Sequence, residues 1–199
     1  MAITRILTTV AVCMLLFASS CIMEDKVLDL VVTGETSTPF SQNETEAQWS
    51  SPALIDVGQE IRQVLEDNGY DESDLEDAKM TSASYGVSAF SQAHDWAIAG
   101  TITVTYKLDT QVLVGYGLQS IRGAIGQKIA APLQAPGVNL VNAALQDFLN
   151  GENPVLIFSV NNETTTPAPS DADPMIFDWR AWLAIQVIIN STVEVPDPF

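Results

Sequence analysis

The chain contains a single histidine, His94, which stands directly before Asp95. Imidazole beside a carboxylate is suited to general acid–base chemistry, and a Ser–His–Asp triad in this chain would have to use His94. Two nearby patterns only approach catalytic or nucleotide motifs. "GVSAF" lacks the second glycine of a nucleophile elbow, and "GYGLQS" has Ser120 where a dinucleotide fingerprint has its third glycine. We therefore expect His94 to be a surface residue and the chain to lack a catalytic triad.

Acidic side chains offer a second kind of chemistry, because paired carboxylates hydrolyse glycosides. The chain has 25 Asp and Glu residues, so carboxylate pairs are abundant and carry little information by themselves. Asp178 is the best single candidate, since "FDWRAW" surrounds it with aromatic residues that could line a sugar site. The simpler interpretation is that Arg180 pairs with Asp178 while the tryptophans pack in the core or cap the sheet.

The most acidic segment, "EDNGYDESDLED" (66–77), has seven carboxylates in twelve residues. Calcium prefers several oxygen ligands on a tightly turned loop, and Asp71, Asp74 and Asp77 are the weak candidates for such a site. The glycine that an EF-hand loop needs is not at the required position. A solvated acidic surface is the favoured interpretation, so we expect no metal and no other cofactor.

The first 21 residues have the pattern of an export signal. Arg5 is the only charged residue among the first 23, residues 6–17 are almost wholly apolar, and Ala18, Ser19, Ser20 and Cys21 follow. A positive start, a short apolar core and a small-residue exit are typical of secretory signals. The apolar run is shorter than the roughly 20 residues that span a bilayer.

"ASSC" (18–21) resembles the lipobox of bacterial lipoproteins, with Ala18 where the family most often has Leu. The resemblance covers only the first tenth of the chain. It implies lipid attachment, including palmitate-type acyl chains, at Cys21 and removal of residues 1–20. Ile22 rather than Asp after the cysteine implies the outer membrane. Cys13 would be lost with the signal, so no thiol would remain free, and the usual zinc sites are then excluded.

The charge balance bears on possible partners. Eight basic residues against 25 acidic ones give a formal net charge of −17. Such a surface repels phosphate backbones, so nucleic acid is not an expected partner. It also repels anionic lipid headgroups, which makes a covalent anchor a sensible way to hold the domain at a membrane.

The remaining chain predicts one sheet-rich domain (27–195) after a tether (21–26), with a tail at 196–199. Period-two patterns predict strands at 27–33, 83–89, 96–108, 112–117 and 179–189, with a hairpin turn at 109–111 and polar loops at 34–51 and 161–174. "PVLIFSV" (154–160) is apolar on both faces and predicts a buried strand. Ser51-Pro52 predicts a helix start, ended by Asn68-Gly69, and a second helix follows Pro136-Gly137 and ends at Asn150-Gly151.

These elements predict an α+β fold, mainly antiparallel β, with a sandwich-like sheet of about six strands and two or three helices. The leading functional hypothesis is a non-enzymatic envelope lipoprotein with a binding or structural role and a protein or glycan partner. Two alternatives stay open. One is an envelope carbohydrate hydrolase that uses acidic residues, and the other is a carrier of an apolar ligand held between the sheet and the helix at 138–149.

Overall fold

The computed structural model describes residues 23–196; Cys21 and the tail at 197–199 lie outside the described residues. Residue contacts divide the chain into two compact units. The larger unit is residues 31–189. The smaller contains, among the described residues, 23–30 at the start of β1 and 190–196 at the end of β8. Residues 23–26, expected in the tether, thus begin a strand.

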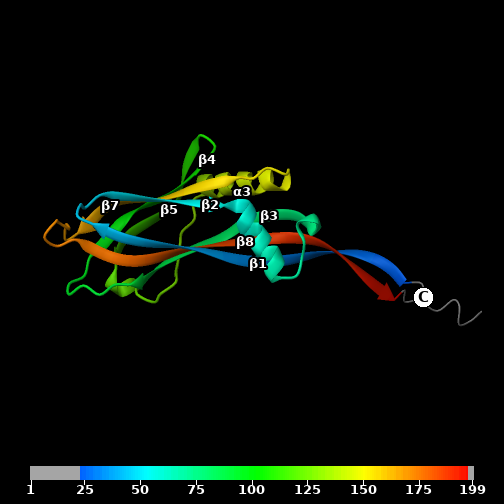
Figure 1. The fold of residues 1–199 in the computed structure, drawn as a ribbon, viewed down its shortest axis with the longest axis horizontal. Coiled ribbons are helices and arrows are strands. Elements are labelled where there is room, and N and C mark those ends of the chain that lie inside the picture. The colour runs from blue at the N-terminus through cyan, green and yellow to red at the C-terminus, as the bar shows by residue number, and fades with distance from the viewer. Residues whose placement is uncertain (1–22, 197–199) are drawn as a thin grey trace, which may run out of the picture. The chain divides into compact units, whose positions relative to one another are not determined.

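The fold is mostly antiparallel β, arranged in two four-stranded sheets with two helices, as the sequence predicts in outline (Figure 1). Sheet A has the order β1-β8-β3-β6, and sheet B has the order β2-β7-β4-β5. The strands of sheet A are β1 (Met23–Glu44), β3 (Leu75–Ala89), β6 (Ile129–Ala130) and β8 (Met175–Pro196). Those of sheet B are β2 (Trp49–Asp56), β4 (Ala97–Tyr106), β5 (Asp109–Ser120) and β7 (Val155–Thr166).

The helices are α2 (Val57–Asp67) and α3 (Ala135–Leu149), with short 3₁₀ turns η1 (Glu72–Asp74) and η2 (Arg122–Ala124). The predicted start of the first helix at Ser51 is wrong, because β2 continues through Pro52 and pairs with β7 as far as Asp56. Pro52 is tolerated there because β2 is an edge strand. Asp56 is the N-cap instead, and its carboxylate accepts a hydrogen bond from the Gln59 amide at 3.0 Å.

The predicted ends of both helices are confirmed. α2 is capped by Asn68, and Gly69 follows with a φ of 79° that suits glycine. α3 is capped by Asn150, followed by Gly151 at a φ of 86°. Apolar residues recur at helical spacing over 138–149, and the buried residues of α3 include Val141, Leu145 and Phe148. Amphipathic spacing located this helix because only one of its faces meets the core.

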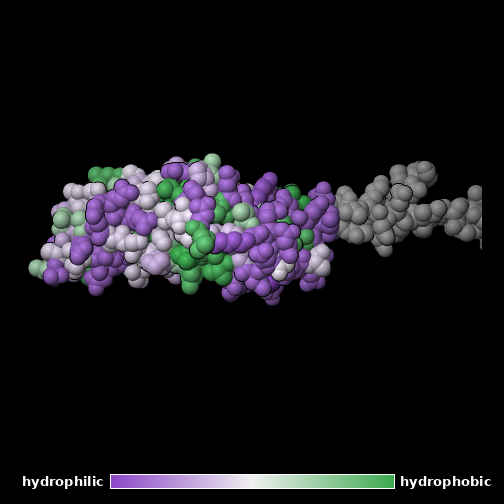
Figure 2. Space-filling view, turned by 90° about the horizontal axis from the view of Figure 1, so that it is seen from above, coloured by the Kyte–Doolittle hydropathy of each residue, from purple (hydrophilic) through white to green (hydrophobic). Residues whose placement is uncertain are grey.

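The core lies between the sheets and is completed by apolar faces of α2 and α3. Val104, Leu145, Val187 and Ile189 are completely buried. The strand predicted from a period of two over 179–189 is confirmed as part of β8, whose residues Trp179, Leu183 and Ile185 are buried as well. On the face shown in Figure 2, strongly hydrophobic residues form small patches among hydrophilic ones.

Four strand-level predictions are wrong. The fold has eight strands rather than six, because β2 occupies the end of a predicted loop and the start of a predicted helix, and the short β6 pairs with β3. The second half of β1 also lies in the polar segment at 34–51. The β4–β5 turn is Lys107-Leu108, with Lys107 at a φ of 55°, rather than 109–111. β7 extends to Thr166, which shortens the following loop to 167–174. Val155 and Ile157 are 46% and 37% exposed, so β7 is not buried on both faces.

Candidate functional site

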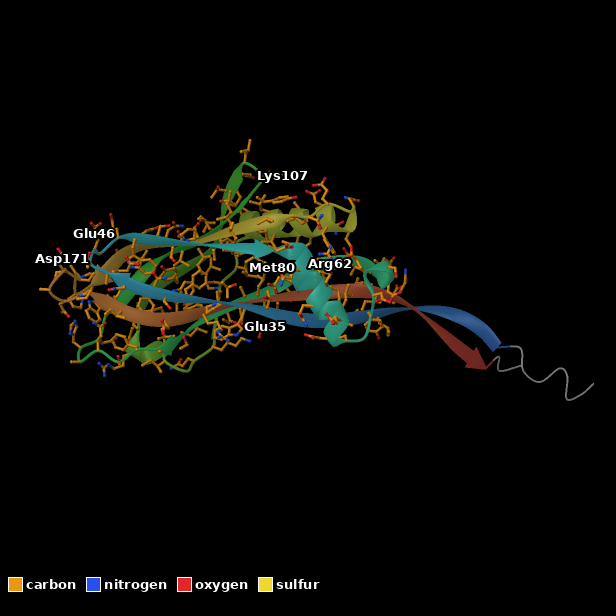
Figure 3. All side chains as sticks on the ribbon, viewed as in Figure 1. Glu35, Glu46, Arg62, Met80, Lys107 and Asp171 are labelled. Carbon is orange, nitrogen blue, oxygen red and sulfur yellow. The ribbon has the colours of Figure 1, made fainter. Side chains whose placement is uncertain are left out.

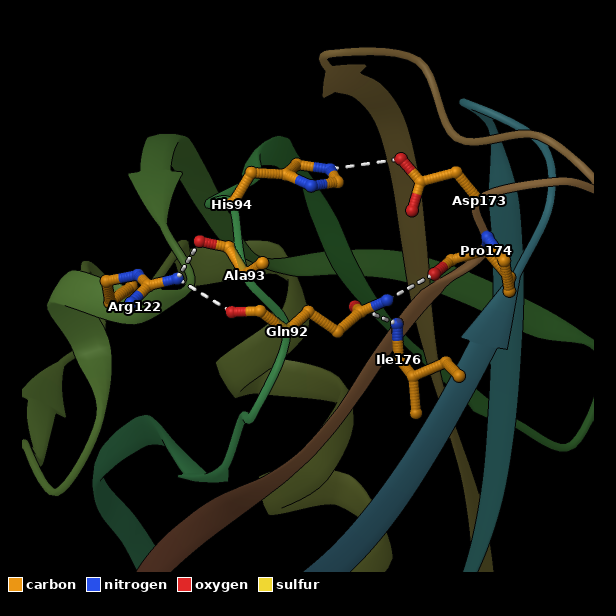
Figure 4. Close-up of polar contacts among 7 residues, drawn as sticks. All are labelled: Gln92, Ala93, His94, Arg122, Asp173, Pro174 and Ile176. Atoms are coloured by element: carbon orange, nitrogen blue, oxygen red, sulfur yellow. Dashed lines mark hydrogen bonds and ion pairs between the residues drawn. The ribbon is translucent and has the colours of Figure 1, made fainter.

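His94, which the sequence marks for acid–base chemistry, lies where the β3–β4 and β7–β8 loops approach each other (Figure 4). His94 does not face Asp95. Its Nε2 lies 3.3 Å from Oδ2 of Asp173, and its ring lies against Trp96 with a centroid distance of 3.9 Å. Both side chains of the His94–Asp173 pair are well exposed, at 43% and 58%. Exposed ion pairs of this kind add little stability, so the pair is a surface contact between two loops.

Gln92 ties the same two loops together more firmly. Its amide Nε2 donates to the carbonyl of Pro174 at 2.6 Å, and its Oε1 accepts from the Ile176 amide at 2.7 Å. The Arg122 guanidinium supports the β3–β4 loop from the other side by donating to the carbonyls of Gln92 and Ala93, at 2.7 and 3.0 Å. The side chains of Gln92 and Arg122 therefore already have hydrogen-bond partners within the protein and do not need a substrate to supply them.

Asp95 and Ser120 are brought together, although far apart in sequence, but not in a catalytic arrangement. The Ser120 hydroxyl donates to Oδ2 of Asp95 and accepts from the Gly123 amide at 2.8 Å. Oδ1 of Asp95 accepts from the Arg122 amide at 2.9 Å. These bonds hold the start of η2 in place. Asp95 is adjacent to Ser120 without the intervening imidazole that would activate a serine nucleophile.

Phe177 and Trp179, the aromatic residues on either side of Asp178, pack inward, whereas Trp182 is half-buried and lies beneath the Lys128 ammonium. Phe177 and Trp179 are buried, and Trp179 stacks on Phe40 with a centroid distance of 4.3 Å. Asp178 alternates with them and is exposed on the opposite face of β8. Among the described residues no ion pair joins Asp178 to Arg180, so the sequence-based expectation of that pair is not met.

A catalytic carboxylic acid needs burial to raise its pKa. The buried polar side chains in the described part of the chain are Gln42, Asn162 and Thr165, and none of them is an acid. Glu44 at the end of β1 comes nearest, because partial burial and the negative charge of Glu46 both raise its pKa. The sequence gives one weak signal for it, two glutamates at alternate positions in "NETEA".

The three weak calcium candidates take part in two separate sets of hydrogen bonds, one at η1 for Asp71 and Asp74 and one beside α3 for Asp77. Oδ2 of Asp74 accepts from the Asp71 amide at 3.1 Å, an arrangement that caps the turn η1. Oδ1 of Asp77 accepts from the Ala78 amide and from the Gln146 side chain of α3, both at 2.9 Å. No cluster of three or more metal-ligating side chains occurs within residues 23–196. Over the same residues, no helix has the length and apolar character to cross a bilayer.

Two internal cavities of about 40 Å³ each lie in the core. Both are lined by Tyr85, Ile102, Val160 and Trp179, so they adjoin each other between the two sheets rather than beside α3. Each has room for only a few water molecules. A carrier site for a drug-sized or lipid ligand is several times larger.

An ordered polar contact joins α3 to the β4–β5 hairpin, whose tip carries Lys107 (Figure 3). The hydroxyl of Tyr106 donates to Oδ2 of Asp147 at 2.6 Å in a half-buried contact, and Lys107 Nζ donates to the same oxygen at 2.8 Å. These two donors, Lys107 first, hold the pKa of Asp147 below its usual value. The same contact raises the pKa of Lys107. Desolvation and then the hydrogen bond to Asp147 raise the pKa of Tyr106.

Tyr116 makes a natural comparison with Tyr106. Its hydroxyl is buried and has no hydrogen-bond partner among the described residues, and burial raises its pKa. We expect Tyr106→Phe to lower the free energy of unfolding by about 1 kcal/mol at neutral pH, because the half-buried hydrogen bond to Asp147 is lost. Tyr116→Phe should be neutral or stabilising, because it removes an unsatisfied polar group. Urea denaturation of both variants beside wild type measures this, and equal losses would contradict it.

Tyr106 and Tyr116 should also make the stability of the protein depend on pH, because both have a raised pKa in the folded state. A pKa raised in the folded state contributes stability below the ordinary tyrosine value of 10.0, and the contribution is lost as pH rises through the folded value. We therefore expect wild type to lose stability above pH 10 and Tyr116→Phe to lose less. Repeating the denaturation at neutral pH and in this alkaline range measures the difference.

Comparisons with known proteins do not identify the chain. No protein-family model matches it, and no curated protein does. Among solved structures, one titled Desmodium yellow mottle tymovirus is 12% identical, with a TM-score of 0.32, over 83% of this chain and 92% of that chain. The decameric BFDV capsid protein is 9% identical, with a TM-score of 0.27, over 81% of this chain and 99% of that chain. Neither TM-score reaches the level at which a likeness supports an argument about this chain.

Proposed function

We propose that the protein is a lipid-anchored bacterial envelope protein with a non-catalytic binding or structural role. The observation that carries the proposal is the apolar segment ending in "ASSC", which places Cys21 at the acceptor position of a lipobox. The mature domain would be held at the membrane, most simply at the outer membrane, by acyl chains on Cys21. Two or more such chains anchor a protein firmly, which an acidic domain cannot achieve through charge.

Three features of the domain support a non-catalytic role. The residues with catalytic potential are committed to loop contacts, as the Ser120–Asp95 pair illustrates. Acidic side chains are absent from the buried set within residues 29–190, which disfavours the carbohydrate hydrolase. The cavities between the sheets are small, which disfavours the carrier.

The two cysteines provide a matched test of the anchor. We expect the full chain, expressed in a bacterial host with an alkyne analogue of palmitate, to be labelled in wild type and in Cys13→Ser. Cys21→Ser should lose essentially all label and keep its signal segment, because the acylated thiol is needed for cleavage in this class of protein. Gel fluorescence and mass spectrometry of the mature N-terminus measure both effects. An unlabelled wild type, or label that survives Cys21→Ser, would refute the proposal.

A further inference from the structure

The outward side of sheet B carries almost no charge, which is unusual in a chain with a net charge of −17. Alternate residues of its strands point away from the core, as the burial patterns of β2, β4 and β7 show. This neutral face comprises alternate residues from 50–54 in β2, 155–161 in β7 and 97–105 in β4, together with Thr110 in β5. All of them are Ser, Thr, Asn, Ala, Pro, Val, Ile or Leu.

Charges begin only at the margins of the neutral face. Asp56 lies at one end, and its carboxylate is used in capping α2. Glu163 is exposed at the other end, beyond Asn161. The outward side of sheet A is different, because it exposes Lys79, Asp178 and Arg180 along its strands.

Hydrogen bonds between side chains run across the neutral face from strand to strand. Ser50 Oγ donates to Asn161 Oδ1 at 2.8 Å, and Asn161 Nδ2 donates to Thr103 Oγ1 at 3.0 Å. The hydroxyls of Thr105 and Thr110 lie 2.8 Å apart. These polar groups are already partly satisfied by one another, so covering them costs less desolvation energy than covering free hydroxyls.

Aliphatic side chains lie beside this polar ladder. Leu54 is 72% exposed, and its directly paired residue on β7, Ile157, is 37% exposed. Val155, two residues along the same face of β7, is 46% exposed. Burying an exposed cluster of this kind supplies a hydrophobic driving force for association.

We infer that the neutral face binds a second copy of this chain, giving a dimer in which two sheets B stack face to face. The charge distribution favours a second copy of the chain as the partner of this face. Two copies of an acidic protein repel each other in most orientations, and the repulsion is least where uncharged faces meet. A two-fold axis brings the same surface of both copies together, so a uniformly neutral face is complementary to itself.

The available area sets the expected strength. The stretches that form the neutral face span 5 residues of β2, 7 of β7 and 9 of β4, with one residue of β5; at about 3.3 Å per residue and about 4.8 Å between strands they cover roughly 350 Å² per copy. The total of roughly 700 Å² is below the size of a stable specific interface, so the dimer should be weak and transient. Salt should strengthen it, because screening reduces the repulsion between the remaining charges. The inference does not depend on lipid attachment at Cys21.

The test introduces one charge at the centre of the neutral face. Thr103 pairs with Ser159 on the two middle strands of sheet B, so near a two-fold axis it would approach its own copy. Sedimentation equilibrium of the chain beginning at residue 21, with Cys21→Ser so that neither signal segment nor lipid is present, should show a monomer–dimer equilibrium. Thr103→Glu should weaken it at least tenfold. Ser88→Glu, which adds the same charge at an exposed position of β3, should leave it within about twofold.

A second experiment distinguishes loss of association from misfolding of the Thr103→Glu variant. Mixing Thr103→Glu with Thr103→Lys should restore association, because opposite charges then meet across the interface. Circular dichroism and thermal melts verify that both variants fold. A wild-type chain that stays monomeric at high concentration and high salt would overturn the inference. Equal weakening by Thr103→Glu and Ser88→Glu, or no rescue by the mixture, would do so as well.

Discussion

Leu145→Ala is expected to lower the free energy of unfolding by about 2–5 kcal/mol, the range for removing a completely buried leucine side chain. Leu145 is 0% exposed and belongs to the face of α3 that closes the core. Truncation removes apolar contacts and leaves a cavity that neighbouring strands cannot fill without moving. For a domain of this size each kcal/mol corresponds to a shift of roughly 2–4 °C in melting temperature.

Leu108→Ala is the matched control for this substitution. Leu108 lies in the two-residue turn between β4 and β5 and is 103% exposed, so the same chemical change should alter stability by no more than about 0.5 kcal/mol. Chemical denaturation with one denaturant and an unchanged m-value is the measurement. A Leu145→Ala variant as stable as Leu108→Ala would mean that α3 does not pack on the sheets as described.

Gly137→Ala is expected to destabilise the fold by about 1–3 kcal/mol, although alanine is favoured over glycine within helices. A Cβ at residue 137 would lie 2.5 Å from Leu113 Cα and 2.6 Å from the Val112 carbonyl oxygen. Both contacts are with the backbone of β5, which cannot rotate away as a side chain can. The overlap must therefore be relieved by moving the start of α3 away from sheet B.

Gly117→Ala provides the comparison, because a Cβ at residue 117 would meet no atom within 4 Å. Gly117 lies in β5, the strand against which Gly137 packs, and its variant should unfold within about 0.5 kcal/mol of wild type. Differential scanning calorimetry of the two variants gives the answer directly. A Gly137→Ala protein that melts at or above wild type would show that helix propensity outweighs the close approach.

Some features of this fold can be predicted from short segments of sequence. The ends of α2 and α3 are signalled by Asn-Gly pairs, since glycine readily adopts the positive φ that follows a helix. The inward face of β8 follows from a period of two over 179–189. In each case the deciding interaction is either local or is repeated along a single face, so one segment is enough to predict it.

The start of α2 illustrates the opposite case. Ser51-Pro52 is an acceptable helix start and an equally acceptable edge-strand pair, and only the register with β7 decides between them. Leu54 is exposed as a consequence, although helical spacing would place it in the core. The polar segment of β1 was missed for the same reason, because its place beside β8 determines its structure.

The candidate site depended on tertiary structure even more strongly. The partner of His94 is Asp173 rather than Asp95, and Asp95 binds Ser120 on another strand. The neutral face likewise exists only because β2, β7, β4 and β5 lie side by side.

By itself the sequence determined the acidic charge, the sheet-rich class and the ends of two helices, and it alone supports the proposal of lipid attachment at Cys21. Tertiary structure alone decided which strands pair, which carboxylates have partners and which face of which sheet is left without charge. The physical reason is that helix caps and alternating faces reflect energies within a few neighbouring residues. Strand register and side-chain pairing are instead set by contacts between segments distant in the chain.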